Sequence, residues 1–355
     1  MIVTIHIFTV ADGRSAGERG ILYDMPWTDD NLMSLQSHVL VEERHHPEAT
    51  GDFTWILSAI SLATKTIGNK VRRARIEDVI GELNESNIQG EKQQKLDVIS
   101  NEIIKACLGS RANIGALVSE EDETPTVLRS HSEGGRYAVL FDPLDGSSNL
   151  DVSVGVGTIF SVVRLGEGVK GTPENMILTP ESKQVAAGYV LYGSSTVFVL
   201  TTGQGVDMFV LDHSIGAFVL VKRDLQIPST RKIYSINEAY ADRFPDAYRS
   251  YLDWAHEEGY SSRYIGSMVA DVHRTLLKGG VFIYPPTNDR PEGKLRYLYE
   301  AMPMSMIIEQ AGGRSIAGDQ GRLLDIKPTS LHERIPVVMG SSIEVDHVER
   351  FLSHS

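Results

Sequence analysis

Residues 137–149 read YAVLFDPLDGSSN, an apolar run that leads into a turn with two carboxylates. The apolar run is typical of a buried strand. Asp142 and Asp145 follow it three positions apart, and Pro143 restricts the backbone between them. Two carboxylates at the end of a strand can converge on one hard divalent cation, and the backbone N–H groups of residues 146–148 can hold a phosphate beside it. Asp, Pro and Gly are also common turn residues, so this stretch alone leaves an ordinary turn open.

A second strand-like run, residues 116–118, also leads into acidic residues. An acidic run is usually a solvated surface. If the two strands end at one edge of a sheet, however, Glu120 and Glu121 join Asp142 and Asp145 there, and so many like charges are tolerable only around metal ions. Oxygen ligands with no His or Cys nearby favour Mg²⁺ or Mn²⁺ over Zn²⁺.

The composition excludes several classes of protein. With 355 residues and 41% hydrophobic positions, the chain is long enough for one large domain or two ordinary ones. Its 34 Lys and Arg against 47 Asp and Glu give a formal charge of −13, which opposes loose binding to nucleic acid or to an anionic membrane. No apolar run near the start approaches the roughly 20 residues of a membrane span, and we read no targeting segment. The single cysteine, Cys107, excludes an intramolecular disulfide and suits a reducing cytoplasm.

Apolar periodicity predicts helices and strands in mixed order. Apolar residues recur at spacings of three and four over residues 53–71 and again over 96–106, which predicts two helices. Between them, residues 82–95 are polar and are expected to form a mobile loop. Strand-like runs follow over residues 116–200, and a second cycle of strands and helices begins near residue 226. We therefore expect a mixed α/β (α+β) fold.

Changes in sequence texture also suggest how the chain is divided. Residues 1–35 show no sustained period and are expected to be a weakly ordered N-terminal extension. We expect a first domain over residues 36–225, which carries the acidic motifs, and a second over residues 226–355.

The second domain supplies charge of the opposite sign. Lys294 and Arg296 lie shortly before Glu300, Arg263 stands beside Tyr264, and residues 235–240 add an amide and a phenol. Taken singly, these are ordinary surface or helix-start residues. A site that holds a phosphate at each end of a sugar would need such groups, because Arg and Lys form charge-assisted hydrogen bonds to phosphate and Tyr forms oriented ones.

Many separate blocks in a fixed order resemble class I fructose-1,6-bisphosphatase, from about residue 38 to the C-terminus. The blocks are GEKQQKLD (90–97), VSEED (118–122), FDPLDGSSN with DVSVGVGTIFS (141–161), KQVAAGYVLYGSS (183–195), YSINEAY (234–240), SRYIGSMVADVHR (262–274), GGVFIYP (279–285) and GKLRYLYEAMPMS (293–305). The acidic turn alone is shared with the wider group of lithium-sensitive sugar phosphatases, so the series of blocks carries the resemblance. It implies a two-part layered α-β-α-β-α sandwich of the sugar-phosphatase type, Mg²⁺-dependent removal of the 1-phosphate of fructose 1,6-bisphosphate, and usually a homotetramer.

The resemblance also implies roles for single residues. The implied metal ligands are Glu120, Asp142, the carbonyl of Leu144, Asp145 and Glu300. The implied substrate contacts are Asp145, the amides of Gly146, Ser147 and Ser148, the side chains of Asn237, Tyr240, Tyr264, Tyr284 and Lys294, and Arg263 reaching into a neighbouring subunit. Water would attack phosphorus in line, without a covalent enzyme intermediate, while Glu121 or a network around Asp97 takes its proton.

Arg296 is expected to pair with an acid of the polar 82–95 stretch. The family often has Asp at that position, whereas this chain has Glu91. The change keeps the charge and lengthens the side chain, which puts the geometry of the loop in question and not the chemistry.

The resemblance also implies an allosteric site for AMP, at residues distant in sequence from the catalytic blocks. The start of the first long helix offers N–H groups and hydroxyls to an anion, and two arginines, one of them at the start of the strand that leads to Asp142, would supply further contacts. The alternative is that these residues are a helix cap and surface arginines. The implied residues are Thr50, Gly51, Asp52, Thr54, Arg136, Tyr137 and Arg164.

The sequence also bears on three other functions. A sedoheptulose-1,7-bisphosphatase or a dual-specificity enzyme fits the same residues. An inositol-monophosphatase type shares the carboxylate motif but has no need of the YSINEAY, SRYIGSM and GKLRYLYE blocks. A non-catalytic, AMP-sensing relative is disfavoured because every implied ligand is present.

Overall fold

The computed structural model describes residues 33–44, 51–86, 92–166 and 173–353. The expected N-terminal extension therefore lies outside the described residues, apart from residues 33–35. The expectation is wrong for residues 33–35, because the chain is already folded at these positions. Leu220 N–H donates to the carbonyl oxygen of Met33 at 2.8 Å, and Leu35 is buried.

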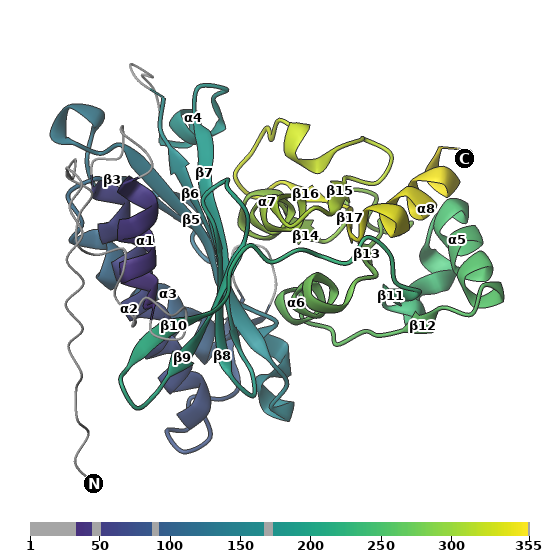
Figure 1. Cartoon of the computed structure of the whole chain (residues 1–355), viewed down its shortest axis with the longest axis horizontal. Helices are drawn as coiled ribbons and strands as arrows, with labels where there is room; N and C mark the ends of the chain where they lie inside the picture. Colours follow the sequence, from purple (N-terminus) through teal and green to yellow (C-terminus); the bar gives the residue numbers. More distant parts are fainter. Residues whose placement is uncertain (1–32, 45–50, 87–91, 167–172, 354–355) are drawn as a thin grey trace, which may run out of the picture.

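An eight-stranded sheet forms the first half of the molecule, with the strand order β10-β9-β8-β7-β6-β5-β3-β4 (Figure 1). β3 pairs with β5 in parallel, and the other neighbours in this sheet are antiparallel. The strands are β3 (Ile114–Ser119), β4 (Thr126–Val127), β5 (Tyr137–Asp145), β6 (Val156–Arg164), β7 (Lys183–Tyr192), β8 (Thr196–Thr201), β9 (Asp207–Asp212) and β10 (Ala217–Lys222). The strand-like runs expected over residues 116–200 are confirmed.

Helices cover one face of this sheet. They are α1 (Leu35–Arg44), α2 (Asp52–Arg73) and α3 (Lys95–Gly109). Val139 and Phe141 of β5 pack in the core beneath them, while Ala138 and Leu140 face the opposite core, as the two-residue period of a strand requires. α2 and α3 confirm the two expected helices.

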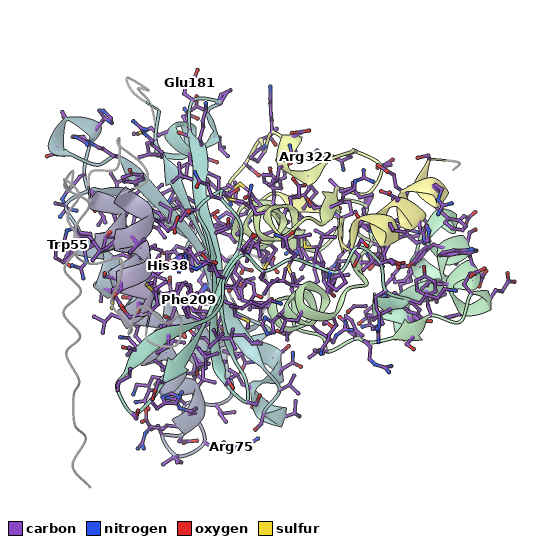
Figure 2. All side chains as sticks on the ribbon, in the orientation of Figure 1. His38, Trp55, Arg75, Glu181, Phe209 and Arg322 are labelled. Carbon is purple, nitrogen blue, oxygen red and sulfur yellow. The ribbon has the colours of Figure 1, made fainter. Side chains whose placement is uncertain are left out.

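The helix α1 was not predicted, because a histidine stands among its described buried side chains, Leu35, His38 and Val39. His38 is buried between α1 and the sheet, where its Nε2 lies 2.8 Å from Asp207 Oδ2 and its ring meets the edge of Phe209 (Figure 2). A polar residue at a core position breaks the apolar period on which helix prediction depends.

A second sheet and two further helical layers complete the fold. The second sheet has the order β12-β11-β13-β17-β15. Its strand β17 divides its residues in the same way as β5: Val337 and Met339 face the core shared with the large sheet, and Val338 faces the outer core. The layers run α-β-α-β-α, which confirms the expected sandwich. The elements are β11 (Ile233–Ser235), β12 (Ser261–Ser262), β13 (Val281–Tyr284), β15 (Arg314–Ile316) and β17 (Val337–Gly340), with α6 (Met268–Lys278) and α7 (Met302–Gln310) between the sheets and α5 (Asp246–Glu257) and α8 (Ser342–Leu352) outside.

The polar stretch before α3 differs from the expectation. Its described parts form an antiparallel strand pair, β1 (Glu82–Ser86) and β2 (Lys92–Gln94), so a loop over the whole of residues 82–95 is wrong. Backbone hydrogen bonds between antiparallel strands need no apolar side chains, which explains why hydrophobic periodicity does not reveal such a pair.

Short elements connect the layers. They are α4 (Pro173–Leu178), β14 (Leu295–Arg296), β16 (Arg334–Ile335) and the 3-10 turns His131–Glu133, Ser147–Val152, Glu238–Arg243 and Leu323–Asp325. The helix expected over residues 299–311 begins later, as α7 at Met302, because residues 299–301 belong to a π-helical turn, Tyr297–Ala301. The wider turn is capped by Arg296 N–H, which donates to Glu300 Oε2 at 2.7 Å.

Candidate active site

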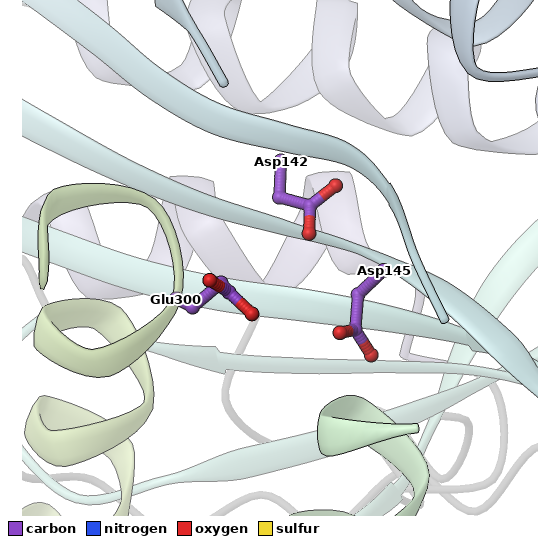
Figure 3. Close-up of side chains that lie close together, drawn as sticks. All are labelled: Asp142, Asp145 and Glu300. Atoms are coloured by element: carbon purple, nitrogen blue, oxygen red, sulfur yellow. The ribbon is translucent and has the colours of Figure 1, made fainter. Parts of the chain in front are cut away.

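Three buried carboxylates meet where β5 ends. Asp142 and Asp145 come from β5 and Glu300 from the π-helical turn, and one oxygen of each lies within 4.8 Å of one oxygen of the others (Figure 3). The elements that carry them belong to the two halves of the chain. Folding of both halves is therefore needed to complete this cluster.

A bulge in β5 explains how Asp142 and Asp145 reach the same side of the sheet. Residues three apart in a regular strand point to opposite faces. Here Asp142 pairs with Ile159 and Asp145 with Gly157, so β5 has one residue more than β6 between the two pairs. The extra residue restores the common direction. The turn is held by Asp142 itself, whose Oδ1 accepts from Leu144 N–H at 2.9 Å.

Asp145 is also tied to the start of α6. Its Oδ2 accepts from Val269 N–H at 2.8 Å and from Ser267 Oγ at 3.0 Å. The neighbouring Gly146 has φ +76°, and a Cβ there would lie 2.5 Å from Ser267 Oγ. The glycine of the acidic turn is thus required twice, by its backbone conformation and by the close approach of α6.

Glu120 reaches the same place from the parallel strand β3. Its N–H donates to the carbonyl oxygen of Phe141 at 3.0 Å, and its Oε1 lies 2.9 Å from Nη1 of Arg296, which is buried. The expectation that β3 and β5 end together in acids is therefore confirmed. Arg296 thus pairs with Glu120. Glu91 lies outside the described residues, so its pairing with Arg296 stays a prediction.

A cavity of about 500 Å³ surrounds the carboxylates. The predicted residues that line it are Asp97, Glu120, Glu121, Asp142, Leu144, Asp145, Gly146, Ser147, Ser148, Tyr264, Tyr284, Lys294, Arg296 and Glu300. A second cavity, of about 280 Å³, contains the predicted Asn237 and Tyr240 and shares Tyr284, Arg290 and Lys294 with the first. The two adjoining cavities together form a depression: the acids line the first cavity, and Tyr284, Arg290 and Lys294 line both.

Burial dominates the electrostatics of the acidic end. It raises the pKa of Asp142 and of Glu300 well above their usual values, with the charge of Glu120 as the next cause. Burial also raises the pKa of Asp145 to about 6, although Val269 N–H and Ser267 oppose the shift. Asp97 behaves alike: burial and then the charge of Glu121 raise its pKa to about 8.

The donor set fits a hard divalent cation. The cluster consists of carboxylate oxygens, which Mg²⁺, Mn²⁺ and Ca²⁺ prefer, and its charge is larger than Arg296 alone can balance. A bound cation favours the ionised carboxylates and so reverses the pKa shifts that burial causes. Asp142, Asp145, Glu300 and Glu120 are the side chains that could hold it.

Arg263, one of the predicted substrate contacts, lies apart from both cavities. Arg263 is exposed, lines neither cavity, and donates from Nη1 to the carbonyl oxygen of Ser262 at 2.7 Å. Its expected role in a neighbouring subunit's site stays a prediction.

The expected allosteric residues are only partly brought together. A cavity of about 210 Å³ is lined by Tyr137, Arg164 and Phe53, which come from β5, β6 and the first turn of α2. Arg136 is exposed and does not line this cavity. Gly51, with φ +73°, caps α2, and Thr54 follows it, but neither is part of the lining. Thr50 and the side chain of Asp52 lie outside the described residues.

Eight further residues line the active-site cavity without having been predicted as site residues, and four of them have polar side chains: Gln94, Ser267, Asp271 and Arg290. Gln94 and Asp97 form a capping box at the start of α3, in which Gln94 N–H donates to Asp97 Oδ2 at 2.9 Å. The helix-start pattern from Ser267 to Asp271 was visible in the sequence and could have indicated the second pair. Arg290 lies in an irregular segment and gave no signal.

Comparison with known proteins places these features in a family. Residues 33–223 match the family model described as "Fructose-1-6-bisphosphatase, N-terminal domain", and residues 227–353 match its C-terminal counterpart. The chain is 49% identical over 323 residues to the "Fructose-1,6-bisphosphatase class 1" of Persephonella marina, a match that covers 90% of this chain and 98% of the relative.

Solved structures of Leishmania major fructose-1,6-bisphosphatase are also similar. The holo form has a TM-score of 0.85 and 42% identity, covering 91% of this chain and 99% of that chain. The T-state form has a TM-score of 0.81 and 41% identity, with the same coverage. Within the described residues, no helix is both long and apolar enough to cross a membrane.

Proposed function

The chain belongs to the fructose-1,6-bisphosphatase family, and on that premise we propose that Mg²⁺, with Mn²⁺ as a substitute, is the metal held by the carboxylates at the end of β5. The reaction itself follows from the family: the enzyme hydrolyses the 1-phosphate of fructose 1,6-bisphosphate to give fructose 6-phosphate and phosphate, a step of gluconeogenesis. The observation that carries the metal proposal is the set of three buried carboxylates whose oxygens lie within 4.8 Å of one another.

The proposed ligands are Glu120, Asp142, Asp145, Glu300 and the carbonyl oxygen of Leu144. A divalent cation bound there supplies charge neutralisation on the transferred phosphoryl group and activates water as a nucleophile. Every proposed ligand lines the 500 Å³ cavity.

The chain's own groups would handle the proton and the phosphate. Asp97 Oδ1 is buried and has no hydrogen-bond partner among the described residues, while Oδ2 accepts from Ser147 Oγ at 3.1 Å. With a pKa of about 8, Asp97 can exchange a proton near neutral pH, directly or through Glu121. The backbone amides that follow Gly146 would hold the 1-phosphate that is removed. Arg296 holds Glu120 in place.

The opposite end of the depression would bind the sugar and its 6-phosphate. Tyr264, Tyr284 and Lys294 line the first cavity, and Asn237 and Tyr240 line the second. Lysine attracts phosphate by charge and tyrosine by oriented hydrogen bonds, so this end suits the second phosphate of a bisphosphate.

We infer that the active form is a homotetramer in which Arg263 completes a neighbouring site. Large apolar side chains are exposed on α1 and α2: Trp55 on α2 (61%; Figure 2), Leu62 on α2 (50%) and Leu40 on α1. Exposed apolar side chains of this size suit a surface that is covered by another copy of the chain. Light scattering and the loss of activity in Arg263→Ala would test this.

AMP is proposed as an inhibitor that binds in the 210 Å³ cavity at the start of β5. The apolar wall around Phe53 suits a base, and Arg164, which faces Tyr137 across the β5–β6 ladder, suits a phosphate. The cavity contains residues of α1, α2 and the large sheet, so a ligand there could shift the helices against the sheet.

A second substrate, sedoheptulose 1,7-bisphosphate, is favoured by one observation. The 280 Å³ cavity continues the sugar end and carries Arg243 besides the shared Arg290 and Lys294. A longer sugar bisphosphate that reaches this cavity therefore meets one further cation, Arg243.

Phosphate release from the two bisphosphates, measured side by side with and without Mg²⁺, tests the proposal. We expect release from fructose 1,6-bisphosphate that stops in EDTA and returns with Mg²⁺ or Mn²⁺. Release that is unaffected by EDTA contradicts the metal assignment. Absence of release, together with AMP binding, would favour the non-catalytic alternative.

Two further assignments complete the proposal. We place the protein in the cytoplasm, which suits its one thiol. We also propose the division into residues 36–225 and 226–355; it is supported by the second sheet, which begins at β11, although one hydrophobic core joins the two parts.

A further inference from the structure

Asp271, in the first turn of α6, is a carboxylate with 0% exposure on the wall of the active-site cavity. It is separate from the metal cluster, which is formed by Asp142, Asp145 and Glu300. Its positive neighbour is Arg274, whose Nη2 lies 3.6 Å from Oδ1. A buried charge of this kind is retained only where it is well hydrogen-bonded.

The hydrogen bonds of Asp271 come from two other segments. Oδ1 accepts from Ser235 Oγ at 2.7 Å, and Oδ2 accepts from Gly266 N–H at 2.9 Å. Ile265 N–H lies 3.0 Å from Oδ1 and 3.1 Å from Oδ2. Asp271 therefore joins the end of β11 and the loop before α6 to the helix itself.

Both segments carry proposed sugar contacts. Ser235 ends β11 two residues before Asn237, and Ile265 directly follows Tyr264. Asn237 lines the second cavity and Tyr264 the first. A single carboxylate thus holds the backbone beside two contacts that lie on different segments of the chain.

The loop before α6 is fixed at its other end by the metal cluster. Asp145 Oδ2 accepts from Ser267 Oγ and from Val269 N–H, and Asn149 Nδ2 donates to the carbonyl oxygen of Gly266 at 3.0 Å. The few residues between Tyr264 and Val269 are therefore held between two buried carboxylates. One of these belongs to the metal site and the other supports the sugar end.

We propose that Asp271 is a positioning residue that sets the spacing between the metal site and the sugar-phosphate contacts, so that both phosphates of one substrate are recognised together. The inference rests on the proposed substrate contacts and adds a residue that acts through them. Asp271 touches no reacting atom in this account.

Replacing Asp271 by Asn tests the idea with almost no change in volume. The amide keeps one acceptor but presents N–H donors to the N–H groups of Ile265 and Gly266, so part of the loop loses its partner. Loss of a charge-assisted hydrogen bond typically costs a factor of about ten or more. The loss should appear where the second phosphate is recognised.

Glu344 offers a matched control elsewhere in the same domain. It also has 0% exposure, and it accepts from Thr230 Oγ1 at 2.6 Å, Arg231 N–H at 2.9 Å and Tyr260 OH at 2.7 Å. It lies on α8 and lines neither cavity of the site. Glu344→Gln therefore reports the general effect of neutralising a buried, hydrogen-bonded acid.

The experiment compares hydrolysis of fructose 1,6-bisphosphate with that of fructose 1-phosphate, which lacks the second phosphate, in the wild type, Asp271→Asn and Glu344→Gln. The ratio of interest is kcat/KM for fructose 1,6-bisphosphate divided by kcat/KM for fructose 1-phosphate. We expect this ratio to fall about tenfold in Asp271→Asn, mainly because KM for the bisphosphate rises, and to stay within about twofold of the wild-type value in Glu344→Gln. Binding of fructose 6-phosphate, followed by calorimetry, should weaken about tenfold in Asp271→Asn only.

An unchanged ratio and unchanged fructose 6-phosphate affinity in folded Asp271→Asn would overturn the inference, and so would an equal loss in Glu344→Gln. If Asp271→Asn does not fold, Ser235→Ala removes one of the same hydrogen bonds; we expect its ratio to fall about threefold, and a wild-type ratio there also overturns the inference. A failure of the proposed function itself is recognised separately, because the wild type would then show no preference for the bisphosphate.

Discussion

The start and the end of β5 differ in the charged side chains that they carry and in how deeply these side chains are buried. At its end, Asp142 and Asp145 are buried with Glu300, and burial raises the pKa of all three. At its start, Tyr137 faces Arg164 beside a partly apolar cavity, and Arg164 is exposed to solvent. The first arrangement calls for a cation, whereas the second is open to an anion that carries an apolar group.

The stretch of β5 between the two ends is suited to connect them. Residues 138–141 are fully buried and belong alternately to the two cores of the large sheet. Close-packed cores do not deform gradually, so a displacement at Tyr137 has to be accommodated along the strand. If AMP binds where we propose, chemistry and regulation occupy the two ends of one rigid element.

The largest effect is expected at the metal end. Asp145→Asn removes one ligand charge without changing volume, and we expect kcat/KM for fructose 1,6-bisphosphate to fall by at least about a thousandfold. Because the substitution relieves repulsion among buried acids, the melting temperature in EDTA should not decrease.

Asp122→Asn is the matched control, because Asp122 pairs with Lys105 at 3.1 Å and does not line the cavity. It should keep activity within about twofold. Near-wild-type turnover of Asp145→Asn in saturating Mg²⁺ would remove Asp145 from the metal site.

The start of β5 should respond to AMP without affecting basal catalysis. Arg164→Ala removes one charged contact from the 210 Å³ cavity, and we expect the AMP concentration for half inhibition to rise at least about tenfold while kcat is unchanged. Lys183, the exposed register partner of Arg164 on β7, lies outside the cavity and provides the control Lys183→Ala. Insensitivity of the wild type to millimolar AMP, or equal inhibition of both variants, contradicts the assignment.

The acids buried near the end of β5 should make the stability of the metal-free protein depend on pH. Acids whose pKa is raised on folding bind protons in the folded state that the unfolded chain has already lost, so their contribution to stability falls as pH rises through the folded pKa. In EDTA we expect stability to decrease between about pH 6.5 and 8.5, with Asp97, whose pKa is about 8, as one source.

His273 does not interfere in that window. Its buried ring has a pKa of about 4, so it favours stability at higher pH and loses its contribution only as pH falls below its unfolded value of about 6.5. Chemical denaturation should show a slope reduced by at most about 1.4 kcal/mol per pH unit in Asp97→Asn, and Mg²⁺ should flatten the wild-type slope. Stability that rises with pH in EDTA would refute the assignment of raised pKa values.

The smallest effect is expected from redox conditions. Cys107 is partly buried on α3 and belongs to neither end of β5, and burial raises the pKa of its thiol. Dithiol reductant or oxidant should therefore change activity by less than about twofold, measured in the wild type and in Cys107→Ser. A large reversible activation by dithiol would show that thiol chemistry reaches the site.

Residues that combine a strand with a conspicuous motif could be predicted from sequence. Asp142, Asp145 and Glu120 follow buried apolar runs, and the structure brings them together at one sheet edge as expected. The bulge that turns Asp142 and Asp145 to one side was not predicted, because register depends on β6 as well as on β5.

Other residues depended on contacts that no local pattern shows. Arg290 lines the cavity because segments distant in sequence pack there, and Arg296 pairs with Glu120 because the two halves of the chain meet. The helix α1 was not predicted because a buried histidine interrupts its apolar stripe. The strands β1 and β2 were not predicted because their backbone pairing needs no apolar side chains.

Binding of Mn²⁺ to the metal-free protein, followed by electron paramagnetic resonance of the free ion, tests whether the carboxylates at the end of β5 hold the divalent cation. We expect the wild type and Asp122→Asn to take up Mn²⁺ with equal affinity, Mg²⁺ to displace it, and Asp145→Asn to bind it at least about tenfold more weakly. Equal uptake by Asp145→Asn and the wild type would show that the divalent cation is held somewhere other than the end of β5.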